Sequence, residues 1–376
     1  MREHPRVATV ITRLEGGAGL VALRCALAQH ADSWPVTLVT GSDGELVRHA
    51  ERAGLDVVVE PALRKPIVPW WDLVALFRLT ALFARAGFDV VHTHTAKAGA
   101  LGRVAARLSA VPRVVHTYHG FPFHRFQARW LRLCYAAVER LLGRLTDDVL
   151  CVGEGVANEA TRLGLATSDR IRAVGVPVSL EPPRADAESR RRARRALRIP
   201  YDRLVVGAVG RLTYQKAPED LVDALARLPR TDVCGVWLGE GELRDRIERL
   251  ARERLGDRFV FAGHRSDVAE LLPAFDVFVL PSRYEGLPLA VIEAMLCGLP
   301  VVATAVNAVP DLVVTGHNGV LVPPRRPDLL AGALSDLLED PAERARMGSA
   351  GNRGIDGERF GIAAVTRELG SVYRGK

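Results

Sequence analysis

The sequence predicts two α/β domains, each a parallel sheet with helices on both of its faces. The length of 376 residues exceeds that of a domain with one ordinary hydrophobic core and suits two domains of about 190 residues each. Short apolar runs alternate with helix-like segments, as they do in parallel α/β sheets. A proline-rich and charged stretch interrupts this alternation once. The expected limits are a first domain at 1–175, a linker at 176–200 and a second domain at 201–360.

The first domain begins with a strand-like run from Val7 to Ile11. A glycine-rich loop from Arg13 to Gly19 follows, and an apolar helix is expected from Leu20 to Ala28. Glycines let a backbone approach a ligand closely, so Gly16 and Gly17 are candidate binding residues. A tight strand-to-helix turn would need them equally. Further strands are expected at residues 36–40, 56–59, 89–92, 113–118 and 148–152.

Histidines gather at the ends of two of these strands, in the segments 92–99 and 116–124. Such a cluster raises the question of a zinc site. However, no Asp or Glu stands in either segment, and the pair His92 and His94 has no second matched spacing. We therefore expect no metal here.

Composition limits the class of protein further. The five cysteines stand far apart without metal-ligand or redox spacing, which favours a reduced, cytoplasmic setting. We expect no secretory signal and no membrane span, because apolar runs stop well short of about 20 residues. The net charge of +7 suits an acidic partner such as anionic lipid, but an arginine-rich composition alone would also give it.

Two helical stretches of the first domain could contact a membrane. Trp70 and Trp71 precede a mostly apolar helix within residues 66–88, and residues 127–145 form a second helix-period run. One face of this run carries apolar side chains, namely Trp130, Cys134, Ala137, Val138, Leu141 and Leu145. Its arginines lie on another face, so it could lie in a lipid interface at the inner face of the cell membrane. A surface helix that packs this apolar face on its own sheet is the more common case.

The expected linker contains Pro177, Pro182 and Pro183, followed by the arginine run 190–195. Prolines and charge are typical of an exposed interdomain segment. No aromatic residues interleave with the arginines and no binding motif accompanies them. We expect a solvated helix and no nucleic-acid partner.

The second domain opens with a strand at 204–210, and the cations Arg211 and Lys216 follow it in a loop. Two cations near the start of a helix suit a diphosphate, because negative charge grows on a phosphate as it leaves. Solvated loop cations are the ordinary alternative. Further strands are expected at 233–238, 259–261 and 277–280, and helices at 327–338 and 363–373.

The stretch Leu280 to Thr304 predicts a strand, a tight loop, a helix over 289–296 and another strand. Glu285 lies in the loop and Glu293 on the helix, at the edge of the sheet where ligands of parallel α/β proteins bind. Carboxylates placed there can accept hydrogen bonds from the hydroxyl groups of a ribose or a hexose. Alternatively, both are ordinary solvated charges, with Glu285 favoured by the helix dipole.

The run Ser282 to Val302 resembles the nucleotide-sugar signature of the family-4 retaining glycosyltransferases, and the resemblance extends over nearly the whole chain. The histidine segments resemble a subgroup that builds bacterial surface polysaccharides or related glycoconjugates. The resemblance implies the GT-B fold, in which two Rossmann-like, doubly wound domains face each other across a cleft. It also implies that the last helix, within 361–376, crosses back to the first domain.

The implied reaction transfers a hexose or N-acetylhexosamine from a nucleoside diphosphate sugar, expected to be a UDP-sugar, to a hydroxyl acceptor. The anomeric configuration would be retained, without a metal or other cofactor. The acceptor would be a lipid-linked saccharide or a small-molecule aglycone. A GT-B-like epimerase acting on UDP-N-acetylhexosamine is the alternative enzyme, and a nucleotide-binding module with a degenerate site is the non-enzymatic one.

The resemblance also assigns roles to residues. Arg211 and Lys216 would bind the diphosphate, Glu293 the ribose, and Glu285 with His119 the sugar. The implied catalytic residues are His119, Arg211, Lys216 and Glu285. The implied donor-binding residues are Gly16, Gly17, Gly210, Arg211, Lys216, His264, Arg265, Glu285, Gly286, Leu287, Pro288, Leu289 and Glu293. The chain departs from the family pattern at Asn307, Ala308 and Asp311, where a glycine and a glutamate are more usual.

Overall fold

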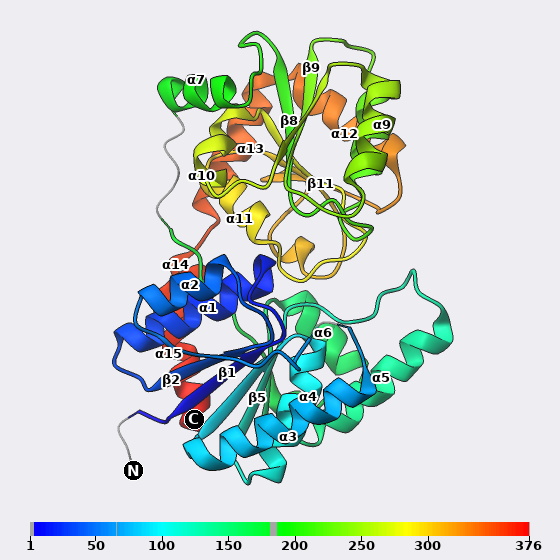
Figure 1. Ribbon diagram of the computed structural model, residues 1–376. Helices are drawn as coiled ribbons and strands as arrows, with labels where there is room; N and C mark the ends of the chain where they lie inside the picture. Colours follow the sequence, from blue (N-terminus) through cyan, green and yellow to red (C-terminus); the bar gives the residue numbers. More distant parts are fainter. Residues whose placement is uncertain (1–3, 65, 181–185, 376) are drawn as a thin grey trace. The chain divides into compact units, whose positions relative to one another are not determined.

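The computed structural model describes residues 4–64, 66–180 and 186–375. Pro182 and Pro183 of the expected linker lie outside the described residues. By residue contacts the chain divides into two units, Met1–Val178 with Gly357–Lys376 and Ser179–Asp356. Figure 1 shows a parallel sheet covered by helices in each of them. The predicted α/β class is confirmed for both units.

The first unit is built on a seven-stranded parallel sheet with the order β3-β2-β1-β4-β5-β6-β7. Buried valines dominate its central strands, which are covered on both faces. The order reverses between β1 and β4, where Val10 pairs with both Val39 and Thr93. The strands are β1 (Val7–Ile11), β2 (Val36–Thr40), β3 (Asp56–Val59), β4 (Val90–His94), β5 (Arg113–Tyr118), β6 (Asp148–Cys151) and β7 (Ile171–Ala173).

Helices cover both faces of the first sheet. On one face α3, α4 and α5 follow one another, and on the other α1 packs against α2 and α15 (Figure 1). The last helix of the chain therefore lies in the first unit. The helices of this unit are α1 (Gly16–Ala31), α2 (Glu45–Arg52), α3 (Pro69–Ala86), α4 (Ala96–Leu108), α5 (Arg129–Gly143), α6 (Glu154–Arg162), the 3-10 turn η1 (Ser168–Arg170), α14 (Gly357–Phe360) and α15 (Ile362–Tyr373). Among the described residues, no helix is both long and apolar enough to cross a membrane.

Two expectations for the first unit are wrong. The glycine-rich segment is not all loop, because α1 begins at Gly16 and not at Leu20. Gly16 starts the helix with a φ of 62°, which glycine adopts without strain. The apolar residues of α5 do not pack on the sheet: Trp130, Val138 and Leu141 are exposed, and Ala136, Glu139, Leu142 and Gly143 are the buried residues of this helix.

The second unit is built on a six-stranded parallel sheet with the order β10-β9-β8-β11-β12-β13. Its strands are β8 (Leu204–Val209), β9 (Val233–Leu238), β10 (Phe259–Gly263), β11 (Val277–Leu280), β12 (Val301–Thr304) and β13 (Gly319–Val322). Its helices are α7 (Ala187–Ala196), α8 (Pro218–Ala226), α9 (Arg244–Leu255), α10 (Val268–Leu271), η2 (Leu272–Ala274), α11 (Leu289–Leu296), η3 (Val309–Asp311), α12 (Pro327–Glu339) and α13 (Pro341–Arg353).

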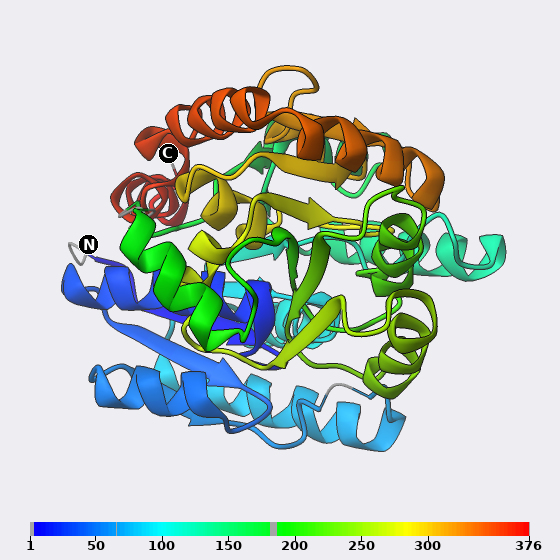
Figure 2. The same ribbon diagram turned by 90° about the horizontal axis from the view of Figure 1, so that it is seen from above.

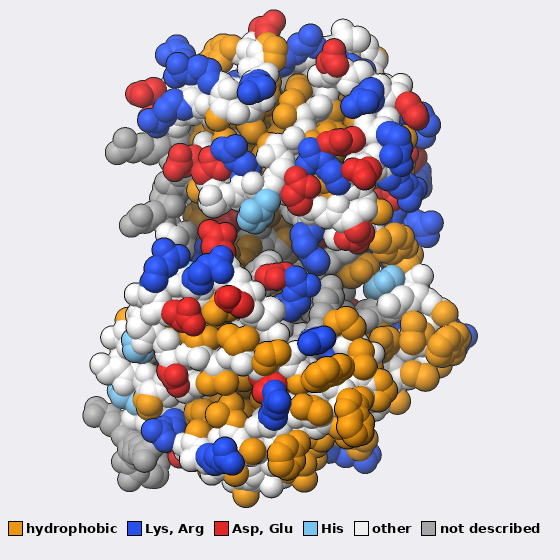
Figure 3. All heavy atoms as spheres, viewed as in Figure 1, with side chains coloured by type: hydrophobic (Ala, Val, Ile, Leu, Met, Phe, Trp, Pro, Cys, Tyr) orange, Lys and Arg blue, Asp and Glu red, His pale blue; other side chains and the backbone are white. Residues whose placement is uncertain are grey.

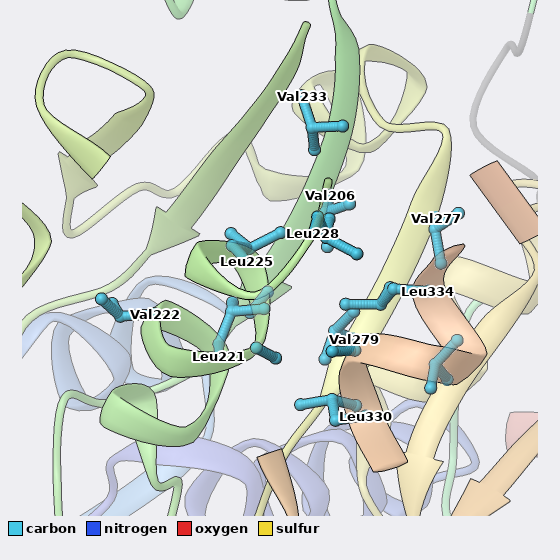
Figure 4. Close-up of a cluster of buried hydrophobic side chains, with 14 of the residues drawn as sticks. Val206, Leu221, Val222, Leu225, Leu228, Val233, Val277, Val279, Leu330 and Leu334 are labelled. Carbon is cyan, nitrogen blue, oxygen red and sulfur yellow. The ribbon is translucent and has the colours of Figure 1, made fainter. Parts of the chain in front are cut away.

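Figure 2 shows two groups of helices on opposite sides of the second sheet, α8, α9 and α12 on one side and α7, α11 and α13 on the other. The first group closes a core of branched aliphatic side chains. In Figure 4, Leu221 and Leu225 of α8 and Leu330 and Leu334 of α12 lie against strand valines such as Val279. This rigid base holds the loops that leave the carboxyl ends of β8 and β11.

The arginine run of the expected linker is only partly solvated, which corrects the expectation from the sequence. Arg190 and Arg194 are four positions apart, so both lie on the inner face of α7, and Arg194 is 2% exposed. The carboxylate of Asp276 accepts hydrogen bonds from Arg190 Nη2 (2.6 Å), Arg194 Nη2 (2.9 Å) and the amide of Val205 (2.7 Å). Asp276 thus ties α7 to the start of β11 and to β8.

Candidate functional site

A cation and a carboxylate meet at the carboxyl ends of two neighbouring strands of the second unit. Lys216 follows β8 and Glu285 follows β11, and these strands pair with each other. Lys216 Nζ lies 2.6 Å from Glu285 Oε1, although 69 positions separate the residues in the sequence. The lysine ammonium has three donors, so this ion pair leaves two N–H groups for other partners.

The Glu285 carboxylate is buried and held in one orientation. Ser282 Oγ donates to the same Oε1 at 2.6 Å, and Gln215 Nε2 lies 3.4 Å from Oε2. The Glu285 amide donates to Asn307 Oδ1 at 2.9 Å. Sequence reasoning assigned no role to Gln215, and it treated Asn307 only as a departure from the family pattern. A side chain held by three groups loses little further entropy when it binds a ligand.

Gly210 lies directly under the lysine side chain. Its φ of 154° is close to the limit of the left-handed region, and a Cβ atom on it would lie 3.1 Å from Lys216 Cε. The carbonyl of Gly210 accepts a hydrogen bond from Trp237 Nε1 at 2.7 Å. Arg211 comes next and is exposed. The structure therefore places a half-buried and an exposed cation on the same strand end.

The segment from Gly286 to Leu289 leads into α11. Leu287, Pro288 and Leu289 are buried, and the helix begins at Leu289 without a side-chain cap or an acidic residue in its first turn. Its first amide groups can therefore serve an anion. Glu293 lies on this helix and is half-buried.

The turn after β10 presents mainly its backbone. Gly263 has a φ of 72°, and its carbonyl accepts the amide of Gly239 at 2.7 Å. Arg265 is bound by both carboxylate oxygens of Asp267, at 2.7 and 2.5 Å, while His264 is exposed. The guanidinium of Arg265 is thus already paired.

The remaining predicted site residues belong to the first unit. Gly16 and Gly17 are exposed at the start of α1, the helix that follows β1, and no side chain caps that helix. His119 follows β5 and is half-buried. Its Nε2 lies 2.9 Å from Nδ1 of His94, a residue considered from the sequence only as a possible metal ligand.

Burial keeps the histidines of this cluster neutral. It lowers the pKa of His119 to about 4 and, together with the nearby His119, the pKa of His92 to about 3. The pKa of His94 also lies well below its ordinary value, because burial and the neighbouring histidines disfavour its charged form. Each neutral ring has one N–H group, so one of His94 and His119 donates and the other accepts.

The other histidines are fixed by buried hydroxyl groups. His92 Nδ1 lies 2.6 Å from the Tyr373 hydroxyl, and its Nε2 lies 2.7 Å from Thr117 Oγ1. His116 Nδ1 lies 2.8 Å from Thr93 Oγ1. Within the described residues, no group of three or more His, Cys, Asp or Glu side chains could hold a metal ion. These rings hold β4, β5 and α15 together.

Among the predicted residues, contacts in the second unit join Gly210, Lys216 and Glu285. The pair of cations and the uncapped start of α11 suit a phosphorylated ligand. The fixed carboxylate suits a ligand with hydroxyl groups. Gly16, Gly17 and His119 lie in the first unit.

Comparison with known proteins identifies two family models along the chain. Residues 189–354 match the glycosyl transferases group 1, and residues 15–182 match Glycosyltransferase Family 4. An Escherichia coli UDP-Gal:alpha-D-GlcNAc-diphosphoundecaprenol alpha-1,3-galactosyltransferase is 29% identical, over 91% of this chain and 89% of that protein. A D-inositol 3-phosphate glycosyltransferase from Corynebacterium aurimucosum is 32% identical, over 88% of this chain and 83% of that protein.

Solved structures resemble the whole chain. Anabaena Alr3699/HepE in complex with UDP and glucose has a TM-score of 0.86 at 22% identity, covering 99% of this chain and 100% of that one. WaaG, a glycosyltransferase involved in lipopolysaccharide biosynthesis, has a TM-score of 0.78 at 18% identity, covering 98% and 100%. At these identities the likeness concerns the fold.

Proposed function

Because the chain belongs to the family-4 and group 1 glycosyltransferases and has their GT-B fold, we propose that it transfers a hexose or N-acetylhexosamine from a UDP-sugar to a hydroxyl acceptor with retention. The observation that carries this proposal is the Lys216–Glu285 pair at the carboxyl ends of β8 and β11. It puts a cation for a phosphate next to a fixed acceptor for sugar hydroxyl groups.

The donor diphosphate binds Lys216, Arg211 and the first amide groups of α11. Lys216 keeps one N–H group on Glu285 and turns its other two to the phosphate that leaves. These positive groups stabilise the charge that grows on the leaving phosphate, so the reaction needs no metal ion. Glu293 accepts from the ribose, and the turn at Gly263 to Arg265 contacts the nucleobase with its backbone.

Glu285 and His119 form hydrogen bonds with the hydroxyl groups of the sugar. The bond from the anomeric carbon to the phosphate oxygen breaks, and a bond from that carbon to the acceptor oxygen forms on the same face. The acceptor proton passes to the leaving phosphate oxygen, so the protein supplies no general base. A neutral His119 suits this step, because it can hydrogen-bond a sugar hydroxyl without adding charge.

We propose a saccharide carried on a lipid as the acceptor, and a small-molecule aglycone as the second choice. The E. coli relative, whose name gives a diphosphoundecaprenol-linked GlcNAc acceptor, supports the lipid-carried saccharide. The similarity to it covers 91% of this chain. The kanosaminyltransferase of Streptomyces kanamyceticus, 30% identical over 76% of each chain, supports the second. The five free cysteines suit a cytoplasmic protein, which would act at the inner face of the cell membrane.

The test is a transfer assay with UDP-glucose, UDP-galactose and UDP-N-acetylglucosamine against lipid-linked and soluble acceptors. We expect one donor to give a product with the anomeric configuration of the donor, as read by NMR, and EDTA to leave the rate unchanged. Glu285→Gln keeps the size of the side chain but removes a charged hydrogen-bond acceptor, so it should lower kcat at least about tenfold. The control Glu343→Gln, at a half-buried carboxylate paired with Arg346, should not. An epimer formed from the donor alone would assign the site to an epimerase, and activity lost to EDTA and restored by manganese would remove the metal-independent mechanism.

A further inference from the structure

One face of the first unit exposes many large apolar side chains. They lie on α3, α4 and α5, which follow one another along the sheet, and each is 52 to 75% exposed. Figure 3 shows orange side chains gathered over α3 and α5. We call this set the apolar face: Trp70, Leu73, Phe77, Leu108, Trp130, Leu133, Val138 and Leu141.

The helix α5 exposes its apolar side, whereas an ordinary surface helix buries it. Its exposed apolar residues recur at helical spacing, while a buried carboxylate, Glu139, anchors it to the unit. Glu139 Oε2 accepts from Arg103 Nη2 and from the Tyr118 hydroxyl, both at 2.7 Å. A helix in contact with water normally buries its apolar stripe. The stripe of α5 therefore has the composition of a surface that is covered by a partner.

The helix α3 adds to the same face. Trp70, Leu73 and Phe77 follow the spacing of one helical face, and Ile67, just before the helix, is 71% exposed. Arg64 lies over the ring of Trp71, 4.8 Å from its centroid. Aromatic rings, a leucine and an isoleucine thus share the outer side of α3 with arginine side chains.

The charge around the apolar face is positive. The helices α3, α4 and α5 contain eight arginines and lysines and two acidic residues, Asp72 and Glu139. Both acids are paired, Asp72 with Lys97 at 2.5 Å and Glu139 with Arg103. Four exposed arginines, Arg78, Arg85, Arg129 and Arg140, lie on these helices, which expose no acid. Arg78 pairs with Glu60, just after β3, at 3.1 Å.

The second unit shows no such gathering among its described residues. Its exposed large apolar side chains are scattered, each on a different element or loop, and single exposed residues of this kind are normal. They are Leu180, Tyr201, Tyr214, Val314 and Leu329.

We propose that the apolar face of α3, α4 and α5 docks on an anionic lipid bilayer. Tryptophan and phenylalanine enter the boundary between headgroups and acyl chains, while the surrounding arginines pair with anionic headgroups. Charge decides between this occupant and a second copy of the chain, because two copies would bring arginine rims together with no exposed helix acid between them. The inference rests on this face alone and does not depend on the proposed reaction.

The test is flotation of the full chain with vesicles of phosphatidylcholine alone or with phosphatidylglycerol. We expect binding to the anionic vesicles and loss of binding at high salt. Arg129→Gln with Arg140→Gln should weaken binding about thirtyfold, because each basic residue near an anionic surface contributes a factor of about five. The matched control replaces the exposed Arg192 and Arg195 of α7 and should bind like wild type.

A second pair of variants tests the apolar side chains. Trp130→Ser with Leu133→Ser should lower flotation at least about tenfold, whereas Tyr201→Ser with Leu329→Ser should not. All four side chains are exposed, so the folds should be unchanged by circular dichroism. Equal flotation of the two double variants, or no binding of wild type to anionic vesicles, would overturn the proposal. If the wild type is a dimer and the double variant Trp130→Ser with Leu133→Ser is a monomer, the face binds a second copy of the chain. That result would also overturn the membrane proposal.

Discussion

The two units of this protein share one architecture, but one unit places a charged pair of side chains at its strand ends and the other places a neutral pair there. In the second unit an ammonium and a carboxylate meet after β8 and β11 at 2.6 Å. In the first, two neutral imidazoles, of His94 at the end of β4 and of His119 after β5, meet at 2.9 Å. Parallel sheets bring the ends of neighbouring strands together, so the fold decides where polar side chains meet. The residue types then decide whether the site holds charge.

In each unit a buried ion pair also anchors a helix. Arg103 of α4 with Glu139 holds α5 in the first unit, and Asp276, directly before β11, with Arg194 holds α7 in the second. These pairs leave the outer sides of the two helices free to differ. The outer side of α5 is apolar, whereas that of α7 carries the exposed arginines 191, 192 and 195.

The largest effect should come from removing the anchor of the second unit. Asp276→Ala leaves the buried guanidinium of Arg194 without its carboxylate, so the free energy of unfolding should fall by about 3 to 5 kcal/mol. Urea unfolding measures it. The control is Asp232→Ala, which breaks an exposed pair with Arg230 and should cost less than about 1 kcal/mol. Equal losses in the two variants would show that α7 is not anchored in this way.

Next in size is the charge at the second unit's strand ends. Lys216→Ala should lower kcat about a hundredfold to a thousandfold at saturating donor, because the leaving phosphate loses a half-buried cation. The exposed control Arg346→Ala, which breaks a pair with Glu343, should react like wild type. A near-normal kcat in Lys216→Ala would falsify the diphosphate assignment of this lysine.

Much of the fold could be predicted because apolar runs with sharp ends define strands. The bounds of β1, β2, β5, β9 and β11 and of helix α11 were predicted to the residue. The start of α1 was not, because glycines are poor helix formers in general. The first turn tolerates them, since its amide groups have no partner within the helix.

The candidate site could be predicted only residue by residue. The sequence assigned Lys216 to the phosphate and Glu285 to the sugar, but their contact depends on which strands are neighbours. Helical spacing likewise reveals an apolar side of α5 without showing which side faces the sheet. Glu139 reads as a solvated charge between Val138 and Arg140, and only its contact with Arg103 shows that it points inward.

Acid should lower the stability of the first unit more than that of the second. In the folded chain His92 and His119 have pKa values of about 3 and about 4. Below pH 6.5 the unfolded chain therefore binds protons that these two rings do not bind in the folded chain. The first unit should thus lose about 1.4 kcal/mol per pH unit for each such ring as the pH falls from 6.5 to 4. In the second unit, burial raises the pKa of Asp220 to about 6, so its folded form takes up a proton first and gains stability over the same fall.

Pulse proteolysis in urea at pH 7.5 and pH 5, with mass spectrometry of the fragments, measures this difference. We expect the urea midpoint of the first unit to fall more than that of the second. His92→Gln, which removes one titrating ring, should reduce the pH dependence of the first unit. Midpoints that move together in both units would contradict the assignment of acid sensitivity to the histidines.

The smallest effect concerns His94, which we expect to position His119. His94→Ala removes the 2.9 Å contact that sets which nitrogen of His119 carries its proton, so kcat should fall about fivefold, the equivalent of one hydrogen bond of about 1 kcal/mol. KM for the donor should change little, because the proposed diphosphate and ribose contacts belong to the second unit. His94→Asn places an amide nitrogen where Nδ1 lies and should restore most of kcat. If Asn and Ala reduce kcat alike while both variants remain folded, then His94 acts only by filling space, and the neutral pair of the first unit has no part in the reaction.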